Sequence, residues 1–442
     1  MKAPLLLLPV LSAPILSMAY EVHEWGTFTT VSGSDGVLLP GLQREEETLP
    51  PFVHSHFGME NGGPMEQARF VELLKRYGKL WPFDPTVGIS SKGLSNRPVS
   101  GVKVKMETPV IYFHSKEAFH AKVHVGFNGG TISQWYPARS GGESLPLPEP
   151  PADPLNHPHP ASAWLIDFSK PYRGDISWDI EVLSPEESRR TLLFKAKDTI
   201  NWLRARVPET NVVRSAGQTE GYLFYRGIGN FDPGLETRID ANETLHILNQ
   251  TGDRIPYLLI YENRSGRHTW KAIDDGIEAG GTSVTPMNEL SPPLAVENDG
   301  TTDWDRVTRE GNFDAGLYRS LKNGIVRNGL LESEADAMIQ TWWDSYFEKS
   351  GLRIFWIVPR TRTDSILPLK VEPTPEKTVR VIVGRSEVFR PNEEAQWLAT
   401  SLKADQKQMW EHHLLSDRFG IALRQRIEAM TLQKNNASTS KR

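Results

Sequence analysis

Apolar and polar residues alternate along much of the segment from position 20 to about 270. In 102–106, and again in 176–182, apolar side chains take every second position, with charged or polar residues between them. A strand with one face in the core and the other in solvent has this period, because successive side chains point to opposite faces. Turn-forming stretches such as 249–253 separate the segments. The pattern predicts a mainly β (α+β) fold built from β-sandwich-like antiparallel sheets.

A helical period replaces this alternation in one clear unit, 314–350. Asp314 is the expected N-cap of a first helix that ends near Gly329, and the stretch 333–336 has the composition of a capping box for a second helix. Apolar residues then recur at helical spacing and form one stripe, which comprises Ala335, Met338, Ile339, Trp342 and Tyr346. These features predict a helix hairpin that packs through a Trp-rich face.

The chain therefore divides into several segments. We expect a signal peptide over 1–19, a β-rich region over 20–300 with a proline-rich loop at 137–160, the helix hairpin within 301–352, C-terminal strands and helices over 353–433, and a disordered tail over 434–442.

The first nineteen residues carry an export signal. Lys2 is the only charge before Glu21, an apolar core follows it, and the small-x-small stretch 17–19 matches a cleavage site. Beyond Ala19 there is no apolar run of 18 residues, so we expect no membrane anchor after cleavage. The mature protein is predicted to be soluble and either secreted or periplasmic.

Composition narrows the chemistry. The chain has no cysteine, which excludes disulfides, thiol nucleophiles, iron–sulfur clusters and CxxCH haem attachment. It has no Walker A loop, so no nucleotide cofactor is expected. A formal charge of -5, without a basic cluster, argues against nucleic acid as a partner. One divalent metal ion, zinc or similar, is the cofactor that remains.

The first candidate metal site comprises His54, His56 and Glu60. In an extended segment the two histidines project to one side about 6–7 Å apart at Cα, and Glu60 adds an oxygen ligand. The HxHxxxE order of 54–60 resembles the first metal motif of cupins. The resemblance covers these seven residues alone, and Thr48 stands where that motif has a glycine.

An alternative metal site follows from a predicted hairpin between 109–114 and 120–127. If His114 pairs with His120 across the turn, the two residues are cross-strand partners about 5 Å apart and can share an ion. A solvated sheet face is the competing interpretation of these residues.

Two carboxylates are candidate catalytic groups. The period of two places Glu24 on the same inward face as Phe28, where a charge needs a partner. A metal ion or a buried arginine, with Arg226 as the named candidate, can supply that partner. Glu107 lies within another strand and is the second candidate acid or base.

Aromatic residues flank the proline-rich loop. Trp135 and Tyr136 lead into it and Trp164 leaves it, an arrangement that suits stacking on sugar rings. Two function classes follow: a metal-dependent hydrolase acting on an extracellular or cell-envelope polymer, or a non-catalytic glycan-binding or surface-interaction protein.

Overall fold

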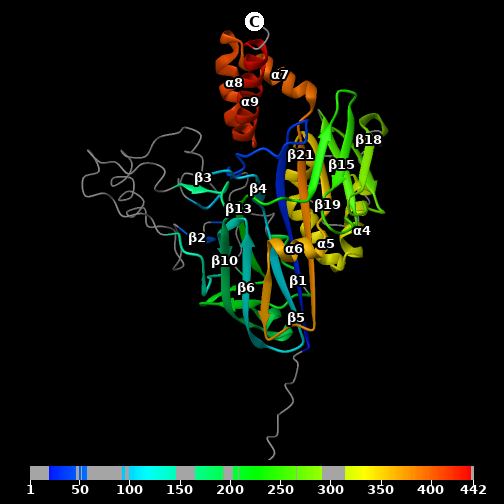
Figure 1. Cartoon of the computed structure of the whole chain (residues 1–442). Coiled ribbons are helices and arrows are strands. Elements are labelled where there is room, and N and C mark those ends of the chain that lie inside the picture. The colour runs from blue at the N-terminus through cyan, green and yellow to red at the C-terminus, as the bar shows by residue number, and fades with distance from the viewer. Residues whose placement is uncertain are drawn as a thin grey trace, which may run out of the picture.

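The computed structural model describes residues 19–45, 49–50, 52–56, 92–94, 99–145, 165–191, 193, 203–207, 209–264, 266–290 and 314–439. Strands dominate these residues, and most of the longer helices belong to a hairpin, α4 and α5, or to the group of α7, α8 and α9 (Figure 1). The predicted mainly β, α+β fold is confirmed.

A large mixed sheet forms the centre of the molecule. Its strands, in spatial order, are β17 (Arg267–Ile273), β16 (Leu258–Arg264), β19 (Gly351–Ile357), β21 (Lys377–Val388), β1 (Tyr20–Ser32), β4 (Val104–Met106), β13 (Leu223–Gly229), β7 (Gly130–Tyr136) and β2 (His54–Ser55), while β5 (Val110–Ser115) pairs with both β1 and β13. Strands β1 and β21 run parallel, and the other pairs of this sheet are antiparallel. Strand β1 is buried on both faces because core residues cover the sheet from both sides.

A second sheet packs against the first and completes the sandwich. It contains β12 (Gln218–Glu220), β11 (Val213–Ser215), β10 (Arg173–Val182), β6 (Phe119–Asn128) and β20 (Leu369–Glu372), with β8 (Gly141–Gly142) beside β10. The first six residues of β6 alternate between buried and exposed, and the three that follow are buried. Its apolar face, for example Val123 and Val125, shares one core with Val22 and Phe113 of the first sheet.

Two smaller sheets extend the structure. The first comprises β14 (Leu235–Ile239), β15 (Thr244–Asn249) and β18 (Thr282–Pro286), and the second pairs β3 (Val99–Ser100) with β9 (Ile166–Asp167).

The helix hairpin covers the other face of the central sheet. It comprises α4 (Ala315–Arg327), α5 (Glu332–Trp343) and a π-helical turn, η3 (Asp344–Glu348). The side chain of Asp314 accepts the backbone N–H of Leu317 at 2.9 Å, which confirms the predicted N-cap. All five residues of the predicted stripe are buried. The predicted second capping box was misplaced: α5 begins after Leu331, whose backbone N–H is bound by Glu334 at 2.9 Å.

The remaining helices are peripheral. Three of them, α7 (Pro391–Ser401), α8 (Lys407–Ser416) and α9 (Gly420–Thr439), form a bundle at one end of the sheets (Figure 1). Short helical segments are α2 (Pro185–Arg190), α6 (Arg360–Ile366), η2 (Met287–Glu289) and η4 (Ala404–Gln406). Within the described residues, no helix has the length and apolar character needed to cross a membrane.

The predicted pairing of β5 with β6 is wrong. The two strands are consecutive in sequence, but β5 belongs to the central sheet and β6 to the second sheet. The reason lies in their residues. Strand β5 is buried on both faces, with Ile111 and Tyr112 entering different cores, whereas β6 has only one apolar face. A strand that is apolar on both sides is most stable between two core layers.

Candidate metal centre

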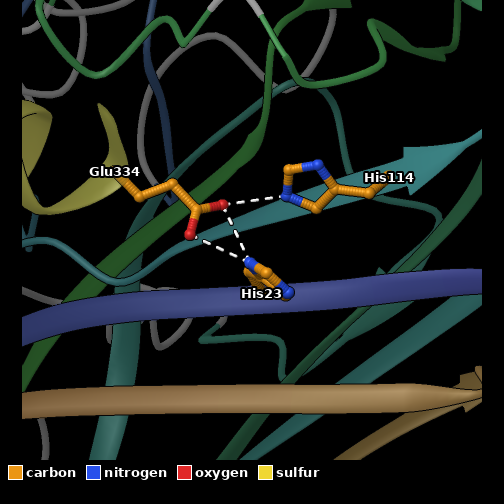
Figure 2. Close-up of side chains that lie close together, drawn as sticks. All are labelled: His23, His114 and Glu334. Carbon is orange, nitrogen blue, oxygen red and sulfur yellow. Dashed lines mark hydrogen bonds and ion pairs between the residues drawn. The ribbon is translucent and has the colours of Figure 1, made fainter. Parts of the chain in front are cut away.

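Three side chains from distant parts of the chain meet on the central sheet (Figure 2). His23 lies on β1, His114 on β5 and Glu334 in the first turn of α5. Nδ1 of His23 lies 2.9 and 3.0 Å from the two carboxylate oxygens of Glu334, and Nε2 of His114 lies 2.8 Å from Oε1. One ligand atom from each residue can be chosen so that all three lie within 4.8 Å of one another.

Strand pairing brings the two histidines together. In the antiparallel pair β1–β5, His114 is opposite Glu21 and His23 is opposite Tyr112, so the histidines are diagonal neighbours. They share the sheet face that Trp25 and Tyr112 present to the hairpin. The two imidazole rings stand 4.5 Å apart between centroids.

Helix α5 brings the carboxylate to the histidines. Glu334 is fully buried, and the pKa of its carboxyl is lowered from 4.5 to about 2. Burial by itself would raise this pKa, but the hydrogen bonds from His114 and His23, together with the charge of His23, outweigh it. Glu334 is therefore ionised at neutral pH.

A second carboxylate lies on the far side of His23. Oε2 of Glu21 is 3.2 Å from Nε2 of His23 and 3.3 Å from Nζ of Lys377. The pKa of Glu21 is lowered, because these two hydrogen bonds and their charges outweigh the effect of burial. Both ring nitrogens of His23 thus face carboxylates.

The two carboxylates restrict which atoms can occupy the space beside the ring nitrogens of His23. A carboxylate that is ionised only accepts hydrogen bonds, so both nitrogens are satisfied only if both are protonated, or if a cation replaces the proton between Nδ1 and Glu334. A ring whose Nε2–H is held by a carboxylate presents Nδ1 as a metal ligand, as in carboxylate–histidine–metal arrangements. The three residues could therefore bind a metal ion, with two nitrogens and one oxygen as ligands.

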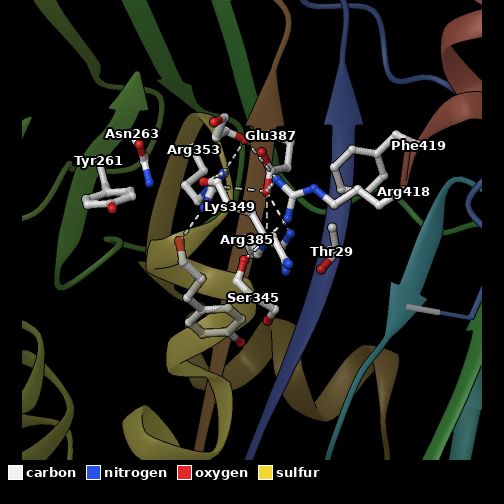
Figure 3. A network of polar contacts seen from close by, with 12 residues as sticks. Thr29, Tyr261, Asn263, Ser345, Lys349, Arg353, Arg385, Glu387, Arg418 and Phe419 are labelled. Carbon is white, nitrogen blue, oxygen red and sulfur yellow. Dashed lines mark hydrogen bonds and ion pairs between the residues drawn. The ribbon is translucent and has the colours of Figure 1, made fainter. Parts of the chain in front are cut away.

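The opposite end of the same helix is held by permanent charges (Figure 3). Arg353, Arg385 and Arg418 converge on one oxygen of Glu387, at 3.2, 2.8 and 2.9 Å respectively. Nη2 of Arg353 also donates to the carbonyls of Lys349 and Ser350 at 2.8 and 2.9 Å. The network anchors the helix that carries Glu334.

Glu24 is buried as predicted, but its partner is a different arginine. Its carboxylate is bound by Arg380, directly opposite on β21, and by the hydroxyl of Tyr225 at 2.6 Å. Arg226 follows Tyr225, so it points to the other face of β13, where it binds Glu45 at 2.6 Å. Glu24 is therefore the carboxylate of a buried ion pair.

Glu107 is likewise enclosed by cations. Lys92 contacts one carboxylate oxygen, and Nζ of Lys105 lies 3.5 Å from the other. Lys92 is completely buried, which lowers its pKa to about 8. Neither candidate catalytic carboxylate belongs to the His23–His114–Glu334 group.

His54 and His56 both contact the ring of Trp135, and the Nε2 atom of each has a hydrogen-bond partner of its own. Nε2 of His54 lies 2.8 Å from Oε1 of Gln218, and Nε2 of His56 lies 2.8 Å from the carbonyl of Ile132. Both contacts need a proton on Nε2, since each partner oxygen only accepts. Glu60 lies outside the described residues.

His114 and His120 do not form the predicted pair. His120 is exposed on β6 and lies opposite Glu181 of β10. His114 instead joins His23 and Glu334, because β5 pairs with β1. The sequence interpretation thus named one of the three candidate ligands, His114, as a metal residue and missed the other two. The available signal was the period of two in β1, which points His23 away from Glu24.

The aromatic residues around the proline-rich loop are less open than stacking on sugar requires. Trp135 is buried, with the guanidinium of Arg139 4.2 Å from the centroid of its ring. Tyr136 is half-buried, and Trp164 lies outside the described residues.

Comparisons with known proteins return nothing for this chain: no family model, curated protein or solved structure matches it.

Proposed function

We propose that this protein is an exported metalloprotein that holds one divalent ion, zinc or similar, at His23, His114 and Glu334. We further propose that it uses the ion to hydrolyse an extracellular or cell-envelope polymer. The convergence of two imidazoles and an ionised carboxylate from three distant segments carries the proposal. Export rests on the features of residues 1–19.

The ligand set favours a catalytic rather than a purely structural ion. Structural zinc sites usually have four protein ligands, whereas catalytic sites have three and one open position. The side chain of His114 is 17% exposed, while those of His23 and Glu334 are 3% and 0% exposed. Solvent therefore approaches the group from the side of His114.

Each residue has a definable task. Glu334 supplies the negative charge, and its low pKa keeps it ready to bind a cation. Glu21 orients His23 from behind, and Lys377 in turn holds Glu21. A bound divalent ion would supply Lewis acidity toward water and toward a carbonyl or phosphoryl oxygen.

Metal analysis of the mature protein tests the site. Wild type, Glu334→Gln and His114→Ala are dialysed against zinc or cobalt and analysed by mass spectrometry, with His120→Ala as the matched control. We expect one ion per chain in wild type and in His120→Ala, and at least about a tenfold loss in the other two. No bound ion, or equal loading in all four proteins, would reject the site.

Hydrolysis is tested separately. Chromogenic glycosides, esters and phosphoesters, followed by cell-envelope polymers, are offered to the loaded protein, the chelated protein and the reloaded protein. Turnover that disappears with chelation and returns with metal supports the hydrolase. An ion that binds without any metal-dependent turnover would reject the hydrolase and leave the metal site standing.

The alternative, a glycan-binding protein without catalysis, has weaker support. It needs an open aromatic surface, and Trp135 is buried beneath Arg139. Polymer binding without turnover in the same experiments would favour it.

A further inference from the structure

Asn211 lies beside the end of β5, against the two residues that flank His114 in the sequence. Its backbone N–H donates to the carbonyl of Phe113 at 2.9 Å. Its side-chain oxygen, Oδ1, accepts the backbone N–H of Ser115 at 2.7 Å, and Nδ2 donates to the carbonyl of Ser115 at 3.1 Å. Three hydrogen bonds from one residue therefore hold the main chain on both sides of His114.

These bonds lie on the edge of β5 that faces away from β1. Along a strand, the N–H and C=O groups of successive residues point to opposite sides. Those of His114 therefore face β1, where Glu21 is the residue opposite. On the other edge, β13 pairs with β5 at 110–111. Further along that edge, Asn211 takes the place of a neighbouring strand.

The amide of Asn211 has one orientation that satisfies its surroundings. Nδ2 also donates to the carbonyl of Leu183, directly after β10, at 2.8 Å. Both amide hydrogens are thus used, while Oδ1 faces an N–H group. A flipped amide would place its oxygen against two carbonyls. Asn211 is 3% exposed, so the amide is a fixed connection between the ends of β10 and β5.

His114 is the candidate ligand that most needs such support. Its side chain is 17% exposed, against 3% for His23 and 0% for Glu334, so packing restrains it least. It also lies one residue before the end of β5, and the ends of elements open more readily than their centres. Side chains of a binding site must be held within about 0.5 Å of their working geometry. The main chain at His114 therefore has to be fixed by a neighbour.

We infer that Asn211 is a positioning residue of the metal centre, and that it acts through the main chain on the ligand His114. The inference rests on the proposed metal site. Because solvent approaches the group from the side of His114, Asn211 also sets where the open position of the bound ion lies. Loss of its amide should alter the affinity for metal and the geometry of the ligands without abolishing binding.

Asn249 is a matched residue in a different sheet. It is fully buried on β15, in the three-stranded sheet, and its Oδ1 accepts the backbone N–H of Thr251 at 2.9 Å. Its Nδ2 donates to three carbonyls, those of Asp253, Ile277 and Glu278. Asn211→Ala and Asn249→Ala each remove a buried amide that binds main-chain groups, but only the first lies beside a candidate ligand.

Zinc affinity and the visible spectrum of the cobalt-loaded protein test the inference. We expect Asn211→Ala to weaken zinc binding by roughly tenfold, as happens when residues that support metal ligands are changed. The cobalt spectrum, which reports ligand geometry, should change as well. Asn249→Ala should keep the affinity and the spectrum of wild type. Equal changes in the two variants, or none in Asn211→Ala, would overturn the inference alone. A wild type that binds no metal would reject the metal site and the inference with it.

Hydrogen exchange in the wild type provides a second measurement that needs no variant, in case Asn211→Ala does not fold. The backbone N–H of Ser115, which Asn211 binds, should exchange at least about tenfold more slowly than that of Lys116 in the exposed bend that follows. Slow exchange at Ser115 would support the inference. Equal rates would show that Asn211 does not hold the main chain beside His114, and would contradict it.

Discussion

The two ends of the helix formed by α5 and η3 differ in the side chains that bind them: histidines at the first turn and arginines at the last. At the first turn, one carboxylate, Glu334, is bound by two imidazoles. At the last turn, main-chain carbonyls and Glu387 are bound by arginines, which stay charged at any physiological pH. Imidazoles gain and lose protons near neutrality and are common metal ligands.

This difference gives the two ends of one helix different roles. Arginines at the last turn also match the helix dipole, because the carbonyl end is negative. Histidines at the first turn have no such advantage, because that end of the helix is positive; they contact Glu334, and His23 also contacts Glu21. The arginine end is therefore suited to hold the helix, and the histidine end has the residues of the candidate metal site.

The largest effect is expected at the arginine end. Arg353→Ala removes a fully buried cation that donates to the carbonyls of Tyr346, Lys349 and Ser350. We expect the free energy of unfolding to fall by about 3–5 kcal/mol, the usual loss when a buried pair is broken. Urea denaturation followed by circular dichroism measures this.

The control for Arg353 is Arg190, whose side chain is 77% exposed and pairs with Glu186. Arg190→Ala should lower the stability by less than about 1 kcal/mol. If the two alanine variants lose similar amounts, the arginine end is not the anchor.

Glu334, at the histidine end, should make the free energy of unfolding depend on pH. The pKa of Glu334 is about 2 in the folded protein and 4.5 ordinarily, so its contribution is complete above pH 4.5 and is lost as the pH falls toward 2. The full contribution is about 3 kcal/mol. Between about pH 5 and pH 3, the stability difference between metal-free wild type and Glu334→Gln should shrink by about 2 kcal/mol.

Denaturation at a series of pH values measures that difference. Glu332 lies on the same turn of α5 with a 77% exposed side chain, so Glu332→Gln is the matched loss of one carboxylate. A constant difference between wild type and Glu334→Gln across this pH range would contradict the account of the histidine end.

The smallest effect is expected for Glu21, which contacts His23 on the side away from Glu334, and it concerns the affinity for zinc. Glu21→Gln keeps the shape of the side chain but removes the charge that orients the ring. Zinc affinity should fall by roughly tenfold, as it does when outer partners of metal-bound histidines are changed. Competition with a fluorescent chelator measures it. His120→Ala is the control, and an unchanged affinity in Glu21→Gln would remove Glu21 from the site.

Local patterns predicted much of the fold. The period of two in 176–182 corresponds to β10, and the helical stripe from Ala335 to Tyr346 is buried as expected. Such periods are local, since they reflect which side of one element faces the core. The burial of Glu24 was predicted for the same reason.

The pairing of elements was not predictable in this way. The β5–β6 hairpin was expected because the strands are adjacent in sequence, but β5 is apolar on both faces and lies in the central sheet. That error led to His120 as the partner of His114. The error with Arg226 has a related cause, since only the register of β1 and β21 makes Arg380 the neighbour of Glu24.

The sequence by itself therefore determined which residues turn inward, because periodicity depends only on neighbours along the chain. It also determined which chemistry is open, because a chain without cysteine is left with histidine and carboxylate as its principal metal ligands. Only the tertiary structure decided which inward residues meet. Glu334 is separated from His23 by 311 positions, and from His114 by 220. Their contact depends on strand order and on the docking of a helix, which no local pattern specifies.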